Sequence, residues 1–125
     1  MPCLVDTCGW IEWLIDGALA DEYAPYLDNP KGLIVPTVLQ FELYKWVKRE
    51  SGEKEALSMV ALTEQGIVVP LSTSLALYAA DVALEYRLSF ADAIIYASAR
   101  QVRVSLVTSD DHFEGLPEVI YFPKR

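Results

Sequence analysis

Apolar and polar positions follow two different spacings along this chain. Short runs rich in Val, Ile, Leu and aromatic residues predict strands at residues 3–5, 33–35, 67–69, 104–107 and 119–122. Longer segments with apolar residues every three or four positions predict helices at about residues 7–16, 37–50, 53–65, 72–86 and 90–102. Strands that alternate with helices predict an α/β fold with a mainly parallel central sheet. No repeat or linker interrupts the pattern, so we expect a single domain over residues 1–125.

The same pattern argues against membrane insertion and secretion. The longest uncharged run, residues 65–80, is interrupted by Pro70 and several hydroxyl residues. A bilayer-spanning helix needs roughly 20 mostly apolar residues. The first basic residue is Lys31, so no basic region precedes an apolar one near the N-terminus, as a secretory signal requires. We therefore expect a cytoplasmic protein.

The cysteine, histidine and glycine residues argue against several classes of functional site. Cys3 and Cys8 form no C-x-x-C pair and are expected to be reduced, buried packing residues. The single histidine, His112, excludes a His-rich zinc site and makes nucleophilic hydrolysis through a histidine base a poor fit. The six glycines are too scattered for a G-x-G-x-x-G or P-loop motif.

The charge is strongly acidic, with a formal net value of −8. An acidic total disfavours extensive contact with phosphates, although it also fits carboxylates concentrated for metal binding. Basic residues are nevertheless gathered in one short segment, at Lys45, Lys48, Arg49 and Lys54. Because Glu50 and Glu53 are interleaved with them, we interpret this segment as a solvated helix face.

Two aspartates follow predicted strands. Asp6 comes directly after the strand at 3–5, and Asp110 comes shortly after the strand at 104–107. Ligand sites in parallel α/β folds form at the carboxyl ends of the strands, so both carboxylates are expected at the same edge of the sheet. For each of them alone, a helix or turn cap is the favoured interpretation, because Asp is a preferred N-cap residue.

Asp92 is a third candidate. It shares a helical face with Ile95, Tyr96 and Ala99, the face expected to pack inward. The competing interpretation is a capping box, in which Ser89 caps the helix and Asp92 lies three residues further on.

Glu42 is a fourth candidate, since Leu39 and Trp46 lie one helical turn away on either side of it. The alternative is a surface ion pair with Lys45, which would contribute only about 0 to 1 kcal/mol.

Several carboxylates gathered in one place raise one another's pKa values unless a cation compensates them. Hard oxygen ligands suit Mg²⁺ or Mn²⁺, and such an ion can activate water and stabilise charge on a phosphodiester. Metal-assisted phosphodiester hydrolysis is therefore the chemistry that these residues fit together.

Four short motifs carry a family resemblance: residues 4–7 (LVDT), 36–43 (PTVLQFEL), 90–95 (FADAII) and 107–113 (VTSDDHF). In this order and spacing, over nearly the whole chain, they resemble the PIN-domain family and most closely VapC-like toxins. The resemblance implies a three-layer α/β/α fold and a Mg²⁺- or Mn²⁺-dependent ribonuclease. It places Asp6, Glu42, Asp92 and Asp110 at the acidic metal-binding positions.

The resemblance also assigns supporting positions and partners. Thr7 and Thr108 match polar positions beside the site, whereas Cys8 stands where many relatives carry serine or another small residue. Asp111 leaves the last acidic position ambiguous by one residue. VapC-like toxins are usually homodimers inhibited by a cognate VapB-like antitoxin, whose C-terminal segment lies across the active site. Trp10, Trp13 and Trp46 could contribute to such interfaces if they were exposed. Aromatic residues at helical spacing are more often buried, so we expect these three side chains in the core.

Other functions remain open at this level. A haloacid-dehalogenase-type phosphoryl-transfer enzyme normally needs an acid two residues after the first, where this chain has Cys8. A receiver-like signalling domain could use an acidic Mg²⁺ pocket, but no convincing lysine stands at the end of a late strand to complete it. A non-catalytic PIN-like binding module, with its acids serving as caps and surface pairs, is the remaining alternative.

Overall fold

A computed structural model describes residues 2–125 of the chain. Its strands are β1 (Cys3–Val5), β2 (Ile34–Pro36), β3 (Ile67–Val69), β4 (Ser105–Thr108) and β5 (Val119–Tyr121). The pairs β1–β4, β4–β5 and β2–β3 are all parallel. A parallel bridge between Cys3 and Leu33 joins the two groups, so the strand order is β3-β2-β1-β4-β5. The predicted parallel sheet is confirmed.

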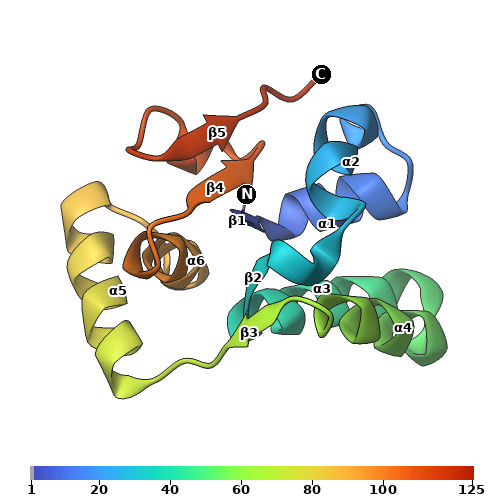
Figure 1. The fold of residues 1–125 in the computed structure, drawn as a ribbon, viewed down its shortest axis with the longest axis horizontal. Coiled ribbons are helices and arrows are strands. Elements are labelled where there is room, and N and C mark those ends of the chain that lie inside the picture. Colours follow the sequence, from blue (N-terminus) through green and yellow to red (C-terminus); the bar gives the residue numbers. More distant parts are fainter. Residues whose placement is uncertain (1) are drawn as a thin grey trace.

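The helices cover both faces of this sheet. They are α1 (Thr7–Leu14), α2 (Ala20–Leu27), α3 (Thr37–Ser51), α4 (Glu53–Thr63), α5 (Thr73–Tyr86) and α6 (Phe90–Gln101), with 3-10 turns η1 (Pro30–Gly32) and η2 (Asp111–Phe113). In Figure 1, α5 lies to the left of the strands and α6 lies below β4 and β5, whereas α1 to α4 lie mainly to the right of the strands. The expected three-layer α/β/α arrangement is therefore present.

Helix α2 is the element that the sequence pattern did not predict. Leu19, Tyr23 and Leu27 recur every four residues and are fully buried, so the helix has an apolar stripe that packs inward. Pro25 lies inside the helix, where a missing N–H and a rigid ring normally disfavour helical structure. Burial of the stripe outweighs that penalty, and this stabilisation is tertiary in origin.

Close packing of α1 depends on Gly9. A Cβ atom at this position would lie 2.5 Å from the ring of Tyr23 and 2.6 Å from Val5. Such distances are shorter than carbon atoms tolerate, so only glycine lets α1 approach both α2 and β1 this closely. The residues on either side of Gly9, including Asp6 at the start of α1, are thereby fixed against the sheet.

The tryptophans differ in their burial. Trp10 lies in the hydrophobic core, as predicted, whereas Trp13 and Trp46 are partly buried and pack against it. Within residues 2–125, no helix is both long and apolar enough to cross a membrane.

Candidate metal centre

The carboxyl ends of β1 and β4 open into a cleft of about 300 Å³. Val5 and Val107 are direct partners in the parallel register, so the residues that follow them leave the sheet side by side. The cleft is lined by the four predicted acids and four further side chains: Asp6, Thr7, Cys8, Ile11, Glu42, Trp46, Asp92 and Asp110. The fold thus brings together four carboxylates that are dispersed through the sequence.

Asp6 lies deepest in the cleft and is only 5% exposed. It is the N-cap of α1, so its carboxylate accepts a 2.8 Å hydrogen bond from the Thr7 backbone N–H. Its other oxygen accepts a 2.8 Å bond from the hydroxyl of Thr108. Burial raises the pKa of Asp6 to about 7 against the lowering effect of these two bonds, and the nearby charges of Asp92 and Glu42 add to the rise. Asp6 is therefore both a helix cap and a member of the acidic cluster.

Glu42 projects from α3 and accepts a 2.7 Å hydrogen bond from the Thr7 hydroxyl. Burial raises the pKa of this carboxyl, and the negative charges of Asp92 and Asp110 raise it further. The alternative ion pair with Lys45 is not formed among residues 2–125, because no cation lies within 4.0 Å of Glu42. Lys45 acts only at longer range, where it lowers the Glu42 pKa.

Asp92 lies in the first turn of α6. Its neighbours on the predicted inward face, Ile95 and Tyr96, are buried, which confirms the assignment of that face. Ser89 occupies the N-cap position, yet its side chain makes no capping hydrogen bond. The capping-box interpretation is therefore wrong for this helix, and the Asp92 carboxylate faces the cleft instead.

Asp110 is the N-cap of η2 and accepts a 3.0 Å hydrogen bond from the backbone N–H of His112. Its own N–H donates to the Thr108 hydroxyl at 3.0 Å, which ties the turn to β4. Phe113 is fully buried and stacks on Tyr96 with ring centroids 6.2 Å apart, so it anchors the turn in the core. Asp111 is exposed and does not line the cleft.

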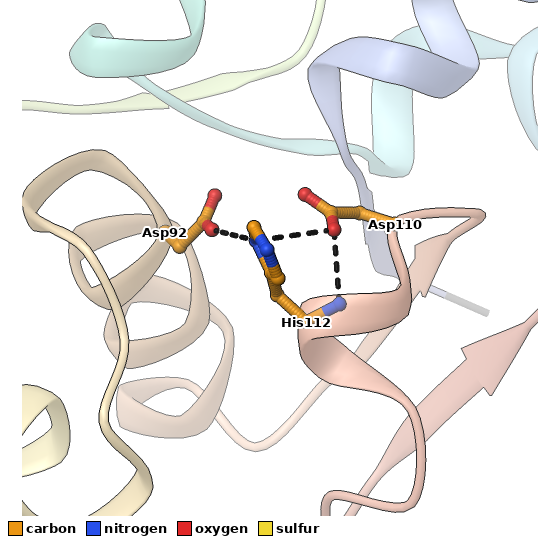
Figure 2. A group of neighbouring side chains, drawn as sticks. All are labelled: Asp92, Asp110 and His112. Atoms are coloured by element: carbon orange, nitrogen blue, oxygen red, sulfur yellow. Dashed lines mark hydrogen bonds and ion pairs between the residues drawn. The ribbon is translucent and has the colours of Figure 1, made fainter.

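His112 is the site residue that the sequence interpretation missed. Its Nδ1 lies 3.1 Å from Oδ2 of Asp92 and 3.3 Å from Oδ1 of Asp110, between the two carboxylates (Figure 2). The hydrogen bond to Asp92 raises the His112 pKa, and the charge of Asp110 raises it further. Its position two residues after Asp110, in a short turn, is the sequence feature that could have indicated a place in the site. The sequence interpretation had used the histidine only to exclude zinc and nucleophilic mechanisms.

Cys8 differs in part from its expected role. Both cysteines are free and Cys3 is buried, as predicted. Cys8 is only partly buried, and its sulfur lies 3.6 Å from Oδ2 of Asp6 and accepts a 3.5 Å hydrogen bond from Ser109. Burial raises the pKa of this thiol, and the charge of Asp6 adds to the effect. Cys8 is thus a polar neighbour of Asp6 rather than an inert packing residue.

The basic segment of α3 is a solvated helix face, as predicted. Lys48 pairs with Glu53 at 3.8 Å, and Arg49 pairs with Glu50 at 3.3 Å. These side chains are half or more exposed, so the pairs contribute little to stability.

The donor set of the cleft fits a hard divalent cation. Carboxylate oxygens dominate it, and one oxygen each of Asp92 and Asp110, together with a nitrogen of His112, lie within 4.8 Å of one another. Burial is the main cause of the raised pKa values of Asp6 and Glu42, and the charges of the neighbouring carboxylates add to it. A Mg²⁺ or Mn²⁺ ion, which prefers oxygen ligands, would compensate these charges.

Solved structures of similar fold come from toxin–antitoxin systems. A toxin–antitoxin complex from Klebsiella pneumoniae aligns with a TM-score of 0.80 and 24% identity, over 98% of this chain and 99% of that one. VapBC2 from Rickettsia felis bound to a promoter DNA fragment, and DNA-bound VapBC from Salmonella typhimurium, each align with a TM-score of 0.72 over 98% of both chains. Their identities are 15% and 16%.

No curated protein matches the amino-acid sequence significantly. The PIN domain family matches residues 3–119, a range that contains all four acids of the cleft. The chain therefore belongs to the PIN-domain family.

Proposed function

We propose that this protein is a metal-dependent endoribonuclease that hydrolyses RNA phosphodiester bonds. The observation that carries the proposal is the convergence of Asp6, Glu42, Asp92 and Asp110 on one open cleft. Without a cation, the carboxylates of such a cluster repel one another and raise one another's pKa values. With a divalent cation, the cluster supplies the positive charge that phosphodiester hydrolysis needs beside the scissile phosphate.

Each side chain has a distinct part in this proposal. The four carboxylates would hold Mg²⁺ or Mn²⁺, and the ion would supply activation of water and stabilisation of negative charge on the phosphate. Thr7 donates to Glu42, and Thr108 donates to Asp6, so both hydroxyls fix the direction of a carboxylate. Burial of Asp6 keeps water from screening its charge, which strengthens its attraction for a cation.

Membership of the PIN-domain family excludes the receiver-like and haloacid-dehalogenase alternatives. The remaining rival is a PIN-like module that binds a partner without catalysis. The two differ in one physical property, since a catalytic cleft requires a bound divalent ion and a purely structural cleft does not.

The test is the Asp92→Asn variant. The amide keeps the shape of the side chain but loses the charge that attracts a metal. We expect single-stranded RNA to be cleaved in Mn²⁺ or Mg²⁺, and cleavage to collapse in excess EDTA and in Asp92→Asn. Asp111→Asn is the matched control, because it removes an equal charge from an exposed neighbour outside the cleft. Single-stranded DNA of the same sequence tests the preference for RNA.

Undiminished cleavage in Asp92→Asn at equal folded fraction would overturn the mechanism. A capping role for Asp92 predicts instead a stability loss of about 1 kcal/mol with cleavage retained.

We further propose that the protein is the toxin of a VapBC-type pair acting on cytoplasmic RNA. The similar folds of toxin–antitoxin complexes support this assignment. Expression of the chain alone should slow growth, and co-expression of an adjacent small reading frame encoding a VapB-like antitoxin should restore it. If growth is indifferent to expression after every neighbouring small frame is deleted, the toxin assignment fails while the nuclease assignment stands.

A homodimer is the proposed assembly. An apolar groove of about 160 Å³ runs between α5 and α6 and is lined by Leu71, Ala76, Ala79, Ala80, Ala83, Phe90, Ala93 and Ile94. Phe90 is 74% exposed at its edge. A large exposed aromatic beside an apolar groove is a common feature of protein interfaces.

A further inference from the structure

We propose that His112 is a nitrogen ligand of the metal held by Asp92 and Asp110, and that this nitrogen favours Mn²⁺ over Mg²⁺. The inference rests on the proposed function, because it assumes that the acidic cleft binds a divalent cation. It adds a ligand that the acidic pattern does not include and an order of preference between the two ions.

The three proposed ligand atoms lie close enough together to bind one ion. Nδ1 of His112 lies 3.1 Å from an oxygen of Asp92 and 3.3 Å from an oxygen of Asp110, and the three atoms lie within 4.8 Å of one another. Neighbouring ligands of a six-coordinate ion with bonds of about 2.1 Å are about 3 Å apart. One ion can therefore contact all three atoms with only small adjustments of the side chains.

The backbone around His112 orients its imidazole ring. Its N–H donates to the same Asp110 oxygen that lies 3.3 Å from its ring, so the turn η2 directs the imidazole toward the carboxylates of Asp92 and Asp110 (Figure 2). Buried Phe113, stacked on Tyr96, fixes the end of that turn in the core. The side chain of His112 is 67% exposed, so burial does not hold the ring in this direction. Among residues 2–125, the ring contacts the carboxylates of Asp92 and Asp110.

The imidazole nitrogen affects which divalent ion the site prefers. Mg²⁺ and Mn²⁺ both take oxygen ligands, but Mn²⁺ is a first-row transition-metal ion and binds imidazole nitrogen more readily than Mg²⁺ does. A site with carboxylates and one imidazole should thus discriminate against Mg²⁺ more than a site with carboxylates alone. Among the oxygen-binding ions considered for this cleft, Mn²⁺ is the one that gains from the nitrogen.

The decisive experiment uses the fact that the chain contains one histidine. In untagged protein loaded with Mn²⁺, any imidazole nitrogen coupling in pulsed electron paramagnetic resonance must come from His112. We expect this coupling in the natural protein and in Asp111→Asn, and its loss in His112→Ala. The readout does not depend on RNA cleavage.

Calorimetric titrations with Mn²⁺ and with Mg²⁺ form the second arm. His112→Asp replaces the nitrogen ligand with an oxygen ligand, so the ratio of Mn²⁺ affinity to Mg²⁺ affinity should fall, because carboxylate oxygen suits both ions. Asp111→Asn should leave the preference unchanged, since its side chain is exposed and outside the cleft.

The outcomes separate this inference from the proposed function. If Mn²⁺ binds and Asp92→Asn abolishes binding, but no nitrogen coupling is seen, His112 is not a ligand and the acidic site stands. An unchanged Mn²⁺/Mg²⁺ preference in His112→Asp would also overturn the inference. If the natural protein binds no divalent ion, both the inference and the metal-dependent mechanism fail.

Discussion

The hydroxyl of Thr108 donates a 2.8 Å hydrogen bond to Asp6, although 102 residues separate them in the sequence. The same hydroxyl accepts a 3.0 Å bond from the backbone N–H of Asp110. One buried side chain thus connects the end of β1, the end of β4 and the turn that presents Asp110. This arrangement explains how acids from opposite ends of the chain are held in one cleft.

Replacing Thr108 tests that connection. Thr108→Val keeps the shape but leaves the Asp110 N–H without its acceptor, so the free energy of unfolding should fall by about 1 to 3 kcal/mol. It also removes a bond that lowers the Asp6 pKa, and Mn²⁺ affinity near pH 7 should fall because the carboxylate is less populated. Urea unfolding and calorimetry measure the two effects. Thr108→Ser keeps the hydroxyl and should retain Mn²⁺ affinity. Equal Mn²⁺ affinities for the valine and serine variants would contradict this account.

The adjacent acids Asp110 and Asp111 should behave differently. Asp110 lines the cleft and Asp111 is exposed, so Asp110→Asn should abolish RNA cleavage and weaken Mn²⁺ binding, while Asp111→Asn should do neither. Asparagine is also a good N-cap residue, so Asp110→Asn should preserve η2. Calorimetry and cleavage assays at matched folded fraction make the comparison. A loss confined to Asp111→Asn would place the metal-binding acid one residue later.

Stability without metal should depend on pH through Asp6. Its pKa of about 7 in the folded protein lies above the ordinary value of 3.8, so the folded state holds the proton more tightly than the unfolded state. Stability should therefore fall as pH rises from about 4 to about 7, by on the order of a few kcal/mol, and the deficit should persist above pH 7.

The Asp6→Asn variant isolates this effect. Glu42 and His112 also have raised pKa values and contribute falls of the same sign, Glu42 above its ordinary value of 4.5 and His112 above 6.5. The informative quantity is thus the difference between the natural protein and Asp6→Asn, in EDTA, from pH 5 to pH 8. Parallel stability curves would show that Asp6 does not titrate in this window. In the natural protein, saturating Mn²⁺ should reduce the fall, because the ion binds the carboxylate form.

The proposed homodimer can be tested at Ala80, which is exposed on α5 and lines the apolar groove. Ala80→Arg places a charge in the groove while keeping a residue with high helix propensity. We expect light scattering to give twice the 14.0 kDa mass of one chain for the natural protein and the single-chain mass for Ala80→Arg. Asp81→Arg adds the same side chain at the next exposed position, outside the groove, and should remain dimeric. A monomeric natural protein at micromolar concentration would remove the proposal.

The sequence by itself determined the α/β class and the positions of the acids relative to the strands. Short apolar runs and apolar residues spaced three or four positions apart reflect local backbone geometry, so they could be interpreted without a structure. Asp6 and Asp110 follow strands whose parallel pairing puts their ends together, and Thr7 and Thr108 flank them as the family resemblance implied. Strand ends differ from the predicted ones by at most one residue, as in β4, which ends at Thr108.

Only the tertiary structure decided the rest, because it depends on contacts between distant segments. Helix α2 contains Pro25 and is stabilised by burial of its apolar stripe, which no local pattern measures. The choice between a capping role and a cleft-facing role for Asp92 was set by the neighbours of α6 rather than by its own sequence. His112 joined the site because η2 turns its ring toward Asp92, a residue 20 positions away. The sequence determines which side chains lie near the end of a strand, and tertiary packing determines which of these side chains contact one another.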